Sequence, residues 1–278
     1  MPILFNSILA QFGFVPENVI LLRHQDKRST TKRTVYEMWR DDREAFDFYQ
    51  STQALENRAR FSRAAYWASF VANPSGSTMF VGLYSARYKG ILTSETPRPA
   101  RYDFLLNPDT DTYELKFDER FADLAGRLFI NWGDGTRAWV QRADNQNKII
   151  TELHREFTEP EFPGFLDFRK PLSEISALPR SWIETLRNSS GVYLLTCPKT
   201  KEHYVGSACG TDGFWQRWMN YVINGHGGNI ALKSREHSDY QVTILEVVGS
   251  AMTQDGILKL EAKWKQKLQS REMGLNSN

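Results

Sequence analysis

Two tyrosines in matched settings are the first residues of this sequence that suggest chemistry. Tyr193 and Tyr204 stand in the tripeptides GVY and YVG, and a lysine-rich link that begins at Pro198 separates them. Residues of matching parity on adjacent strands share one face, so a hairpin here can aim both phenols at one site. Because tyrosine is common in strands, the pair alone indicates packing more strongly than chemistry.

An arginine lies on the aromatic face of the helix predicted after this hairpin. The segment DGFWQRWMNYVIN begins at a capping residue and ends before a glycine. At 100° per residue, Arg217 shares a face with Phe214, Trp218 and Tyr221. Since arginine is rarely buried without an anionic partner, it requires a carboxylate or a phosphate, or else it is a stacked structural arginine.

A carboxylate lies in the apolar stripe of a second predicted helix, which runs from about Thr253 to Ser270. Glu261 is four residues after Ile257 and three before Trp264. A lone carboxylate that faces a core is costly unless a cation or a metal pairs with it. Glu261 is therefore the best single candidate for a metal ligand.

In their order along the chain, these residues resemble the GIY-YIG nuclease family. The resemblance covers residues 189–278, and the stretch 204–232 is most similar to the restriction-endonuclease-like branch. One departure from the family pattern is valine in place of isoleucine in both the GIY and the YIG motif. Another is Tyr221, at a position where some members have histidine, and this leaves the identity of the general base open. The matching elements are Gly191-Val192-Tyr193, Tyr204-Val205-Gly206, Arg217, Glu261 and Asn276.

The resemblance implies hydrolysis of phosphodiester bonds. Glu261 would hold one divalent cation, Mg²⁺ or Mn²⁺, which binds oxygen ligands and keeps several waters. Arg217 would neutralise the phosphate in the transition state. Tyr193 would position or deprotonate the attacking water, supported by Tyr204 and Tyr221. Because a free phenol has a pKa near 10, Tyr193 would need Arg217 and the metal close by.

Two more residues are assigned by their place in the family pattern. His226 lies in a glycine-rich turn, where a backbone can approach a ligand, and the resemblance places it near the substrate. An exposed histidine in a helix-terminating turn is the alternative. Asn276 would fix the site through hydrogen bonds, or would belong to a disordered tail.

The composition and the turn-forming residues along the chain indicate a globular α+β protein of two domains. The 278 residues are 41% apolar and 24% charged, without an apolar run near the roughly 20 residues that span a bilayer. We expect a strand-rich recognition domain over 1–170, forming a curled sheet or small barrel, and a helical linker over 171–188. The nuclease domain over 189–278 would be a small antiparallel sheet flanked by helices.

The expected N-terminal elements are one helix and several strands. Helical spacing covers 43–64, and strand-like stretches follow at 66–73, 78–87, 101–106, 112–117, 127–132 and 137–141. Trp67, Tyr84, Trp132 and Trp139 suit a domain that stacks a flipped-out modified base, or they are core residues.

A net charge of only +2 means that attraction to DNA must come from local clustering. One basic cluster is present in a Ser/Thr-rich segment that is expected to be a surface loop, and it is interpreted as a DNA contact or simply as a solvated loop. Its members are Arg23, Lys27, Arg28, Lys32 and Arg33.

The sequence therefore predicts a restriction-type endonuclease that cuts double-stranded DNA at a specific or modified sequence. A structure-specific repair nuclease and a DNA-binding protein that does not cleave are the alternatives. Cutting both strands with one active site requires a homodimer on DNA or two sequential nicks, and the sequence does not choose between them. The N-terminus lacks a secretory signal, so we expect a cytoplasmic protein with no membrane partner.

Overall fold

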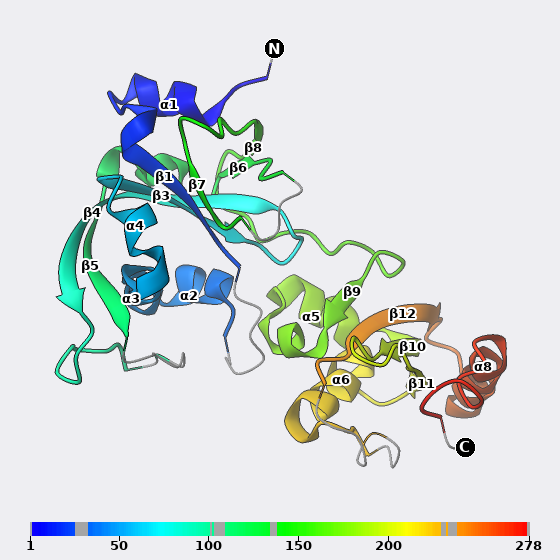
Figure 1. Cartoon of the computed structure of the whole chain (residues 1–278). Coiled ribbons are helices and arrows are strands. Elements are labelled where there is room, and N and C mark those ends of the chain that lie inside the picture. Colours follow the sequence, from blue (N-terminus) through cyan, green and yellow to red (C-terminus); the bar gives the residue numbers. More distant parts are fainter. Residues whose placement is uncertain are drawn as a thin grey trace. The chain divides into compact units, whose positions relative to one another are not determined.

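The computed structural model of the chain describes residues 2–25, 33–100, 102, 109–133, 138–228, 232 and 238–276. It divides into two compact units, Met1–Pro160 and Glu161–Asn278 (Figure 1). Both units combine helices with sheets, which confirms the predicted α+β class. Within the described ranges, no helix is long and apolar enough to cross a membrane.

The first unit is built on an eight-stranded, strongly twisted sheet (Figure 1). The main path is β2-β5-β4-β3-β1-β7, and β6 pairs with both β4 and β8. Strands β1 and β3 run parallel, while β3 and β4 form an antiparallel hairpin. The strands are β1 Val19–His24, β2 Thr52–Ala54, β3 Tyr66–Ala72, β4 Thr78–Ile91, β5 Thr110–Phe117, β6 Leu128–Ile130, β7 Val140–Arg142 and β8 Ile150–Leu153.

The prediction of one continuous helix over 43–64 is wrong. Helix α3 ends at Ser51, because Thr52–Ala54 leaves the helix to pair with β5 as strand β2. The Thr52 hydroxyl donates to the Phe48 and Tyr49 carbonyls at 3.2 and 3.0 Å, which satisfies acceptors at the helix end. The helices are α1 Phe5–Gln11, α2 Val35–Asp41, α3 Arg43–Ser51 and α4 Arg58–Phe61, with 3₁₀ turns at Pro16–Asn18 (η1), Leu55–Asn57 (η2) and Glu119–Leu124 (η3).

Most of the aromatic residues expected to read a base are core residues instead. Trp67 is fully buried against Phe61 and Tyr113, and Trp132 packs beside Phe70. Trp67 lies on β3, whose inner residues are buried on both faces of the sheet, and Trp132 lies just after β6. Of the predicted strands, 101–106 falls largely outside the described residues.

The second unit has a four-stranded sheet in the order β11-β10-β12-β9. The hairpin of β10 and β11 is as expected, and β10 also pairs antiparallel with β12 within the expected small antiparallel sheet. Helix α6 ends at Gly225, whose φ of +76° suits glycine, and the Thr253 hydroxyl caps α8. The elements are β9 Arg169–Pro171, η4 Leu172–Ala177, α5 Arg180–Arg187, β10 Ser190–Thr196, β11 His203–Ala208, α6 Gly213–Asn224, β12 Gln241–Val248 and α8 Gln254–Lys267.

Helices α6 and α8 cover opposite faces of this sheet (Figure 1). Tyr193 on β10 packs against Phe214 and Trp218 of α6 and is paired in register with Gly206 of β11. Ser207 follows Gly206 and therefore faces the other way, where it contacts α8. Strand β11 is at the edge of the sheet, and its consecutive residues Gly206 and Ser207 belong to opposite faces.

Candidate active site

The buried Tyr193 ring lies across the edge strand because Gly206 has no side chain. A Cβ at Gly206 would stand 2.5 Å from the Tyr193 hydroxyl and 2.9 Å from the Tyr204 ring. Both tyrosines thus occupy space on the face that Gly206 leaves open. The glycine of the YVG motif is required by this close packing of the two phenols.

Arg217 joins two of the tyrosines into one hydrogen-bonded group. Its Nε donates to the Tyr193 hydroxyl at 3.0 Å, and a terminal nitrogen donates to the Tyr221 hydroxyl at 3.2 Å. The two hydroxyls lie 2.9 Å apart and share one further hydrogen bond. The second terminal nitrogen donates to the Gly227 carbonyl at 2.9 Å, which fixes the plane of the guanidinium.

Burial controls the ionisation of these phenols. Tyr193 is completely buried, and this desolvation raises its pKa well above the ordinary value, against the opposing charge of Arg217. Burial likewise raises the pKa of Tyr221. A raised pKa is opposite to what a base needs near neutral pH, because the phenol stays protonated.

Tyr204 completes the aromatic group. Its ring lies 6.4 Å from the Tyr221 ring, at an edge-to-face angle of 66°. It is 7% exposed, whereas Tyr193 and Tyr221 are 0% and 1% exposed. Among these three phenols, Tyr204 has the most access to solvent.

The turn that contains His226 is packed onto the same group. Gly227 adopts φ of +52°, and a Cβ there would stand 2.6 Å from the Tyr221 ring. The Asn224 side chain accepts from the His226 and Gly227 amides at 3.0 and 2.6 Å, and His226 Nδ1 accepts from the Gly228 amide. The structure therefore places His226 one residue from the carbonyl that Arg217 holds.

Asn276 is an ordered, buried residue that completes the edge strand. Its side chain accepts from the Val205 amide at 2.9 Å and donates to the Val205 carbonyl at 2.8 Å. The amide group thereby takes the place of a neighbouring strand beside β11. Because Val205 lies between Tyr204 and Gly206, Asn276 holds the backbone that carries both motif residues.

Glu261 is not a lone carboxylate, since two donors reach it. Lys265 Nζ lies 2.7 Å from one carboxylate oxygen, and the Ser207 hydroxyl donates to the other. The exposed fractions of the Lys265 and Glu261 side chains are only 7% and 13%. Among the described residues, Glu261 makes no hydrogen bond or ion pair with Arg217 or the three tyrosines.

The donor set around Glu261 suits one weakly held divalent cation. Within the described ranges no group of three or more His, Cys, Asp or Glu side chains is placed to hold a metal. Mg²⁺ often uses one or two carboxylates and keeps several waters, so a single glutamate with a neighbouring hydroxyl is chemically compatible. A metal on Glu261 would compete with the Lys265 ammonium for the same carboxylate.

Residues 189–276 match the sequence model of the GIY-YIG catalytic domain. The C-terminal unit carries a GIY-YIG domain. That finding confirms the family resemblance, and it extends over every residue of the site described above. The N-terminal half lies outside the match.

Similar proteins are endonucleases encoded by introns. The probable intron-encoded endonuclease bI1 of Neurospora crassa is 34% identical over 95 residues, which is 31% of this chain and 21% of that protein. The chain thus spans about a fifth of that relative's length. Two structures of the catalytic domain of the intron endonuclease I-TevI are 25% and 26% identical, cover 32% of this chain and 94% and 98% of theirs, and give TM-scores of 0.28 and 0.27.

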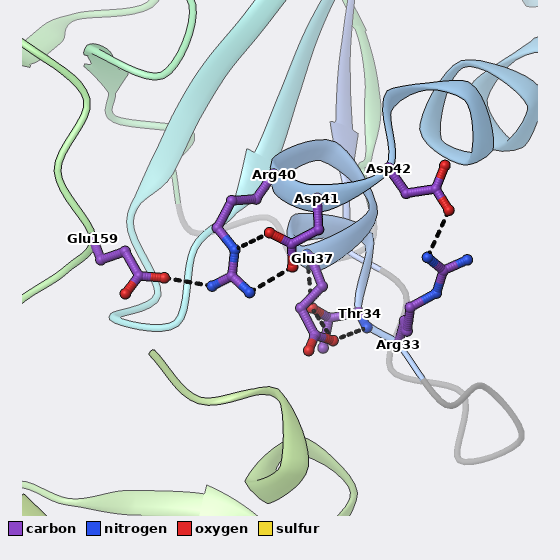
Figure 2. A network of polar contacts seen from close by, with 7 residues as sticks. All are labelled: Arg33, Thr34, Glu37, Arg40, Asp41, Asp42 and Glu159. Atoms are coloured by element: carbon purple, nitrogen blue, oxygen red, sulfur yellow. Dashed lines mark hydrogen bonds and ion pairs between the residues drawn. The ribbon is translucent and has the colours of Figure 1, made fainter. Parts of the chain in front are cut away.

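The predicted basic loop lies apart from the GIY-YIG domain in sequence and is only partly described. Arg23 belongs to strand β1, so its expected place in a loop is wrong; burial lowers its pKa. Arg33 points to Asp42 at 2.8 Å, beside the capping box of Thr34 and Glu37 (Figure 2). Lys27, Arg28 and Lys32 lie outside the described residues.

Sequence reasoning missed three contributors to the GIY-YIG site. Lys265 is one helical turn after Glu261, a spacing that by itself indicates an ion pair. Ser207 follows the YVG motif directly, yet only the fold shows that it meets α8. Gly227 was one glycine among several in its turn, and nothing in the sequence distinguishes it.

Proposed function

We propose that the chain is a metal-dependent DNA endonuclease of restriction type, with the first unit targeting the GIY-YIG domain to a specific or modified sequence. The observation that carries this proposal is the Arg217 guanidinium, fixed between the Tyr193 and Tyr221 hydroxyls in a recognised nuclease domain. The intron-encoded endonucleases among the similar proteins support a DNA substrate. The expected place of action is the cytoplasm.

Arg217 would keep donors for a phosphate after its contacts within the chain are made. Of the five N–H donors of a guanidinium, three are used within the described part of the chain, by Tyr193, Tyr221 and Gly227. The two that are left lie on different terminal nitrogens, and each would be able to donate to a phosphate oxygen. Charge that develops on those oxygens would be stabilised without any movement of the guanidinium.

The exposure of the phenols favours Tyr204 over Tyr193 as the group that meets the attacking water. Tyr193 is enclosed and protonated, so its role is to hold Arg217 in place. Tyr204 is the least buried phenol of the same group. A general base must reach the water before its pKa matters, and that requirement selects Tyr204.

Glu261 would hold the metal, with Ser207 orienting the carboxylate from β11. When bound, Mg²⁺ would supply positive charge near the phosphate and lower the pKa of a coordinated water. Ser207 and Gly206 are consecutive, so the two faces of β11 would contribute opposite sides of one site at the sheet edge. DNA bound there would meet Arg217 on one side and Glu261 on the other.

The test is cleavage of a panel of DNAs with and without Mg²⁺. The panel contains unmodified plasmid, cytosine- and adenine-methylated plasmid, and hydroxymethylated and glucosylated phage DNA. Wild type is compared with Glu261→Ala and with Glu272→Ala, which removes an exposed glutamate of the same unit. We expect discrete fragments from one substrate class, and we expect them to be lost only in Glu261→Ala. The ratio of linear to nicked plasmid reports whether one or both strands are cut.

Two outcomes would contradict the proposal. Cleavage that is independent of Mg²⁺ and of Glu261 would reject the assigned metal ligand. Retained binding of DNA with no cleavage of any substrate would indicate a binding protein with a nuclease-like domain.

A further inference from the structure

A cavity in the first unit combines polar and aromatic walls and is not part of the nuclease site. Its volume is about 390 Å³, and its lining comprises Arg43, Asp47, Tyr84, Phe117, Ala122 and Ala125. Pockets for small molecules and cofactors typically enclose ~300–1,000 Å³. The cavity therefore has room for one planar heterocycle.

The aromatic wall is a cross-strand pair that a glycine makes possible. Tyr84 of β4 is opposite Phe117 of β5, with ring centroids 5.4 Å apart at 74°. A Cβ at Gly82, two residues before Tyr84, would stand 2.6 Å from the Phe117 ring and 2.8 Å from the Tyr84 ring. Tyr84 is buried and Phe117 is half-buried, so Phe117 offers ring surface for stacking.

The polar wall of the cavity comprises the Asp47 carboxylate, which is an acceptor, and the Arg43 guanidinium, which is a donor. Asp47 and Arg43 are one turn apart on α3, so their side chains share a face. Gln50 donates to the Asp47 carboxylate at 2.9 Å and accepts from the buried Ser69 hydroxyl at 2.7 Å. The Arg43 guanidinium stacks 4.5 Å above the Trp39 ring.

The carboxylate is partly removed from water. Burial raises the pKa of Asp47, although hydrogen bonding from Gln50 and the nearby Arg43 charge act in the opposite direction. A desolvated carboxylate gains more from a ligand N–H than a hydrated one does, because the surrounding dielectric is low. Asp47 thus favours a ligand that presents hydrogen-bond donors.

We propose that this cavity binds one nucleobase extruded from DNA, and that it selects a base with an exocyclic amino group. The amino group would donate to Asp47, a ring acceptor would receive a hydrogen bond from Arg43, and Phe117 would stack on the base. Thymine and uracil present two carbonyl groups, one on each side of a single N–H. The Asp47 carboxylate would repel those carbonyl oxygens. The inference rests on the proposed function, because it identifies an extruded base as the part of the DNA that the first unit recognises.

Deoxycytidine and deoxyuridine are a matched pair of probes, because they differ only at C4, which carries an amino group or a carbonyl group, and at the neighbouring N3, which is a bare acceptor or an N–H donor. Binding of each nucleoside to the full chain is measured by saturation-transfer NMR in EDTA, where no metal-dependent cleavage occurs. We expect a preference for deoxycytidine of about tenfold, the scale of one hydrogen bond to a charged group. Equal binding of the two nucleosides, or binding of neither, overturns the proposal.

Three variants tie the preference to the cavity. Asp47→Asn should abolish the preference, and Ala122→Leu, at an exposed lining position, should weaken binding of deoxycytidine by filling the space. Glu114→Gln removes a carboxylate from the opposite face of β5 and should change nothing. If Asp47→Asn fails to fold, Ala122→Leu decides: unchanged deoxycytidine binding in that variant rejects the cavity.

A second arm distinguishes an extruded base from a free nucleoside. Anisotropy in EDTA compares a duplex in which one cytosine faces an abasic site with the same duplex in which it faces guanine. Tighter binding of the abasic duplex, lost in Asp47→Asn, supports extrusion, and equal binding of the two duplexes overturns it. Because neither arm uses cleavage, a chain that fails to cut DNA can still pass both, and an active nuclease can fail both.

Discussion

The Arg217 guanidinium donates from Nε to the Tyr193 hydroxyl at 3.0 Å and from a terminal nitrogen to the Tyr221 hydroxyl, and both tyrosines are buried. The arginine is thereby held by the phenol, and the phenol is kept protonated by its burial. Under the proposed function, Tyr193 would therefore position Arg217, and the charge of Arg217 would be left for a phosphate.

Arg217→Lys tests that role directly. Lysine keeps the charge but has no planar fork, so the contacts with Tyr193, Tyr221 and Gly227 are not all made at once. We expect kcat for DNA cleavage to fall by about 10²- to 10³-fold, the range seen when a preorganised donor to a transition-state oxyanion is removed. DNA affinity in EDTA should stay near wild type. Arg187→Lys, on the exposed end of α5, is the matched control, and an unchanged kcat in Arg217→Lys would make the arginine structural.

Lys265→Met should strengthen metal binding. The Lys265 ammonium occupies a Glu261 oxygen at 2.7 Å, so its removal frees the carboxylate for a cation. We expect Mn²⁺ affinity, followed by electron paramagnetic resonance of the free ion, to rise roughly five- to tenfold, about 1 to 1.4 kcal/mol. Lys259→Met, which breaks an exposed pair on the same helix, should leave the affinity unchanged. Weaker Mn²⁺ binding in Lys265→Met would show that the lysine arranges the carboxylate instead.

Asn276→Ala should loosen the edge strand. The variant leaves the Val205 amide and carbonyl without their buried partner, at a cost of about 2–4 kcal/mol in the free energy of unfolding. Hydrogen exchange at the Val205 amide should become faster, and cleavage should decline with it because Tyr204 and Gly206 adjoin this residue. Unaltered protection of Val205 would contradict the assigned contact.

His24 should make the first unit sensitive to acid. It is buried, and desolvation lowers its pKa from 6.5 to about 4. The unfolded chain therefore binds more protons between these values, so stability is present above pH 6.5 and is lost as the pH falls toward 4. The full loss is roughly 3 kcal/mol, from the size of the shift. Urea titrations between pH 4 and 7 should show a smaller pH slope for His24→Leu than for wild type, and equal slopes would reject the assignment.

Local features of the second unit could be predicted from the sequence because nearby residues encode them. Glycine after α6 and threonine before α8 mark helix ends, and the alternation in GVYLLT marks a strand. The order of GVY, YVG, Arg217, Glu261 and Asn276 was sufficient to indicate the GIY-YIG domain, since family spacing is itself a property of the sequence. The predicted helix over 43–64 failed because Thr52–Ala54 gains more from pairing with β5 than from continuing α3.

Only the tertiary structure decided which groups share an environment. Periodicity placed Glu261 in an apolar stripe, but the fold brought Ser207 to it from another element, and Lys265 was buried beside it. The GVY motif indicated Tyr193 as a site residue. The complete burial and the raised pKa of Tyr193 arise from residues of α6 and the neighbouring strands. Asp47, Tyr84 and Phe117 meet around one cavity only because α3, β4 and β5 pack together. Ionisation and access depend on distances and burial between segments far apart in the chain, and sequence spacing does not contain these quantities.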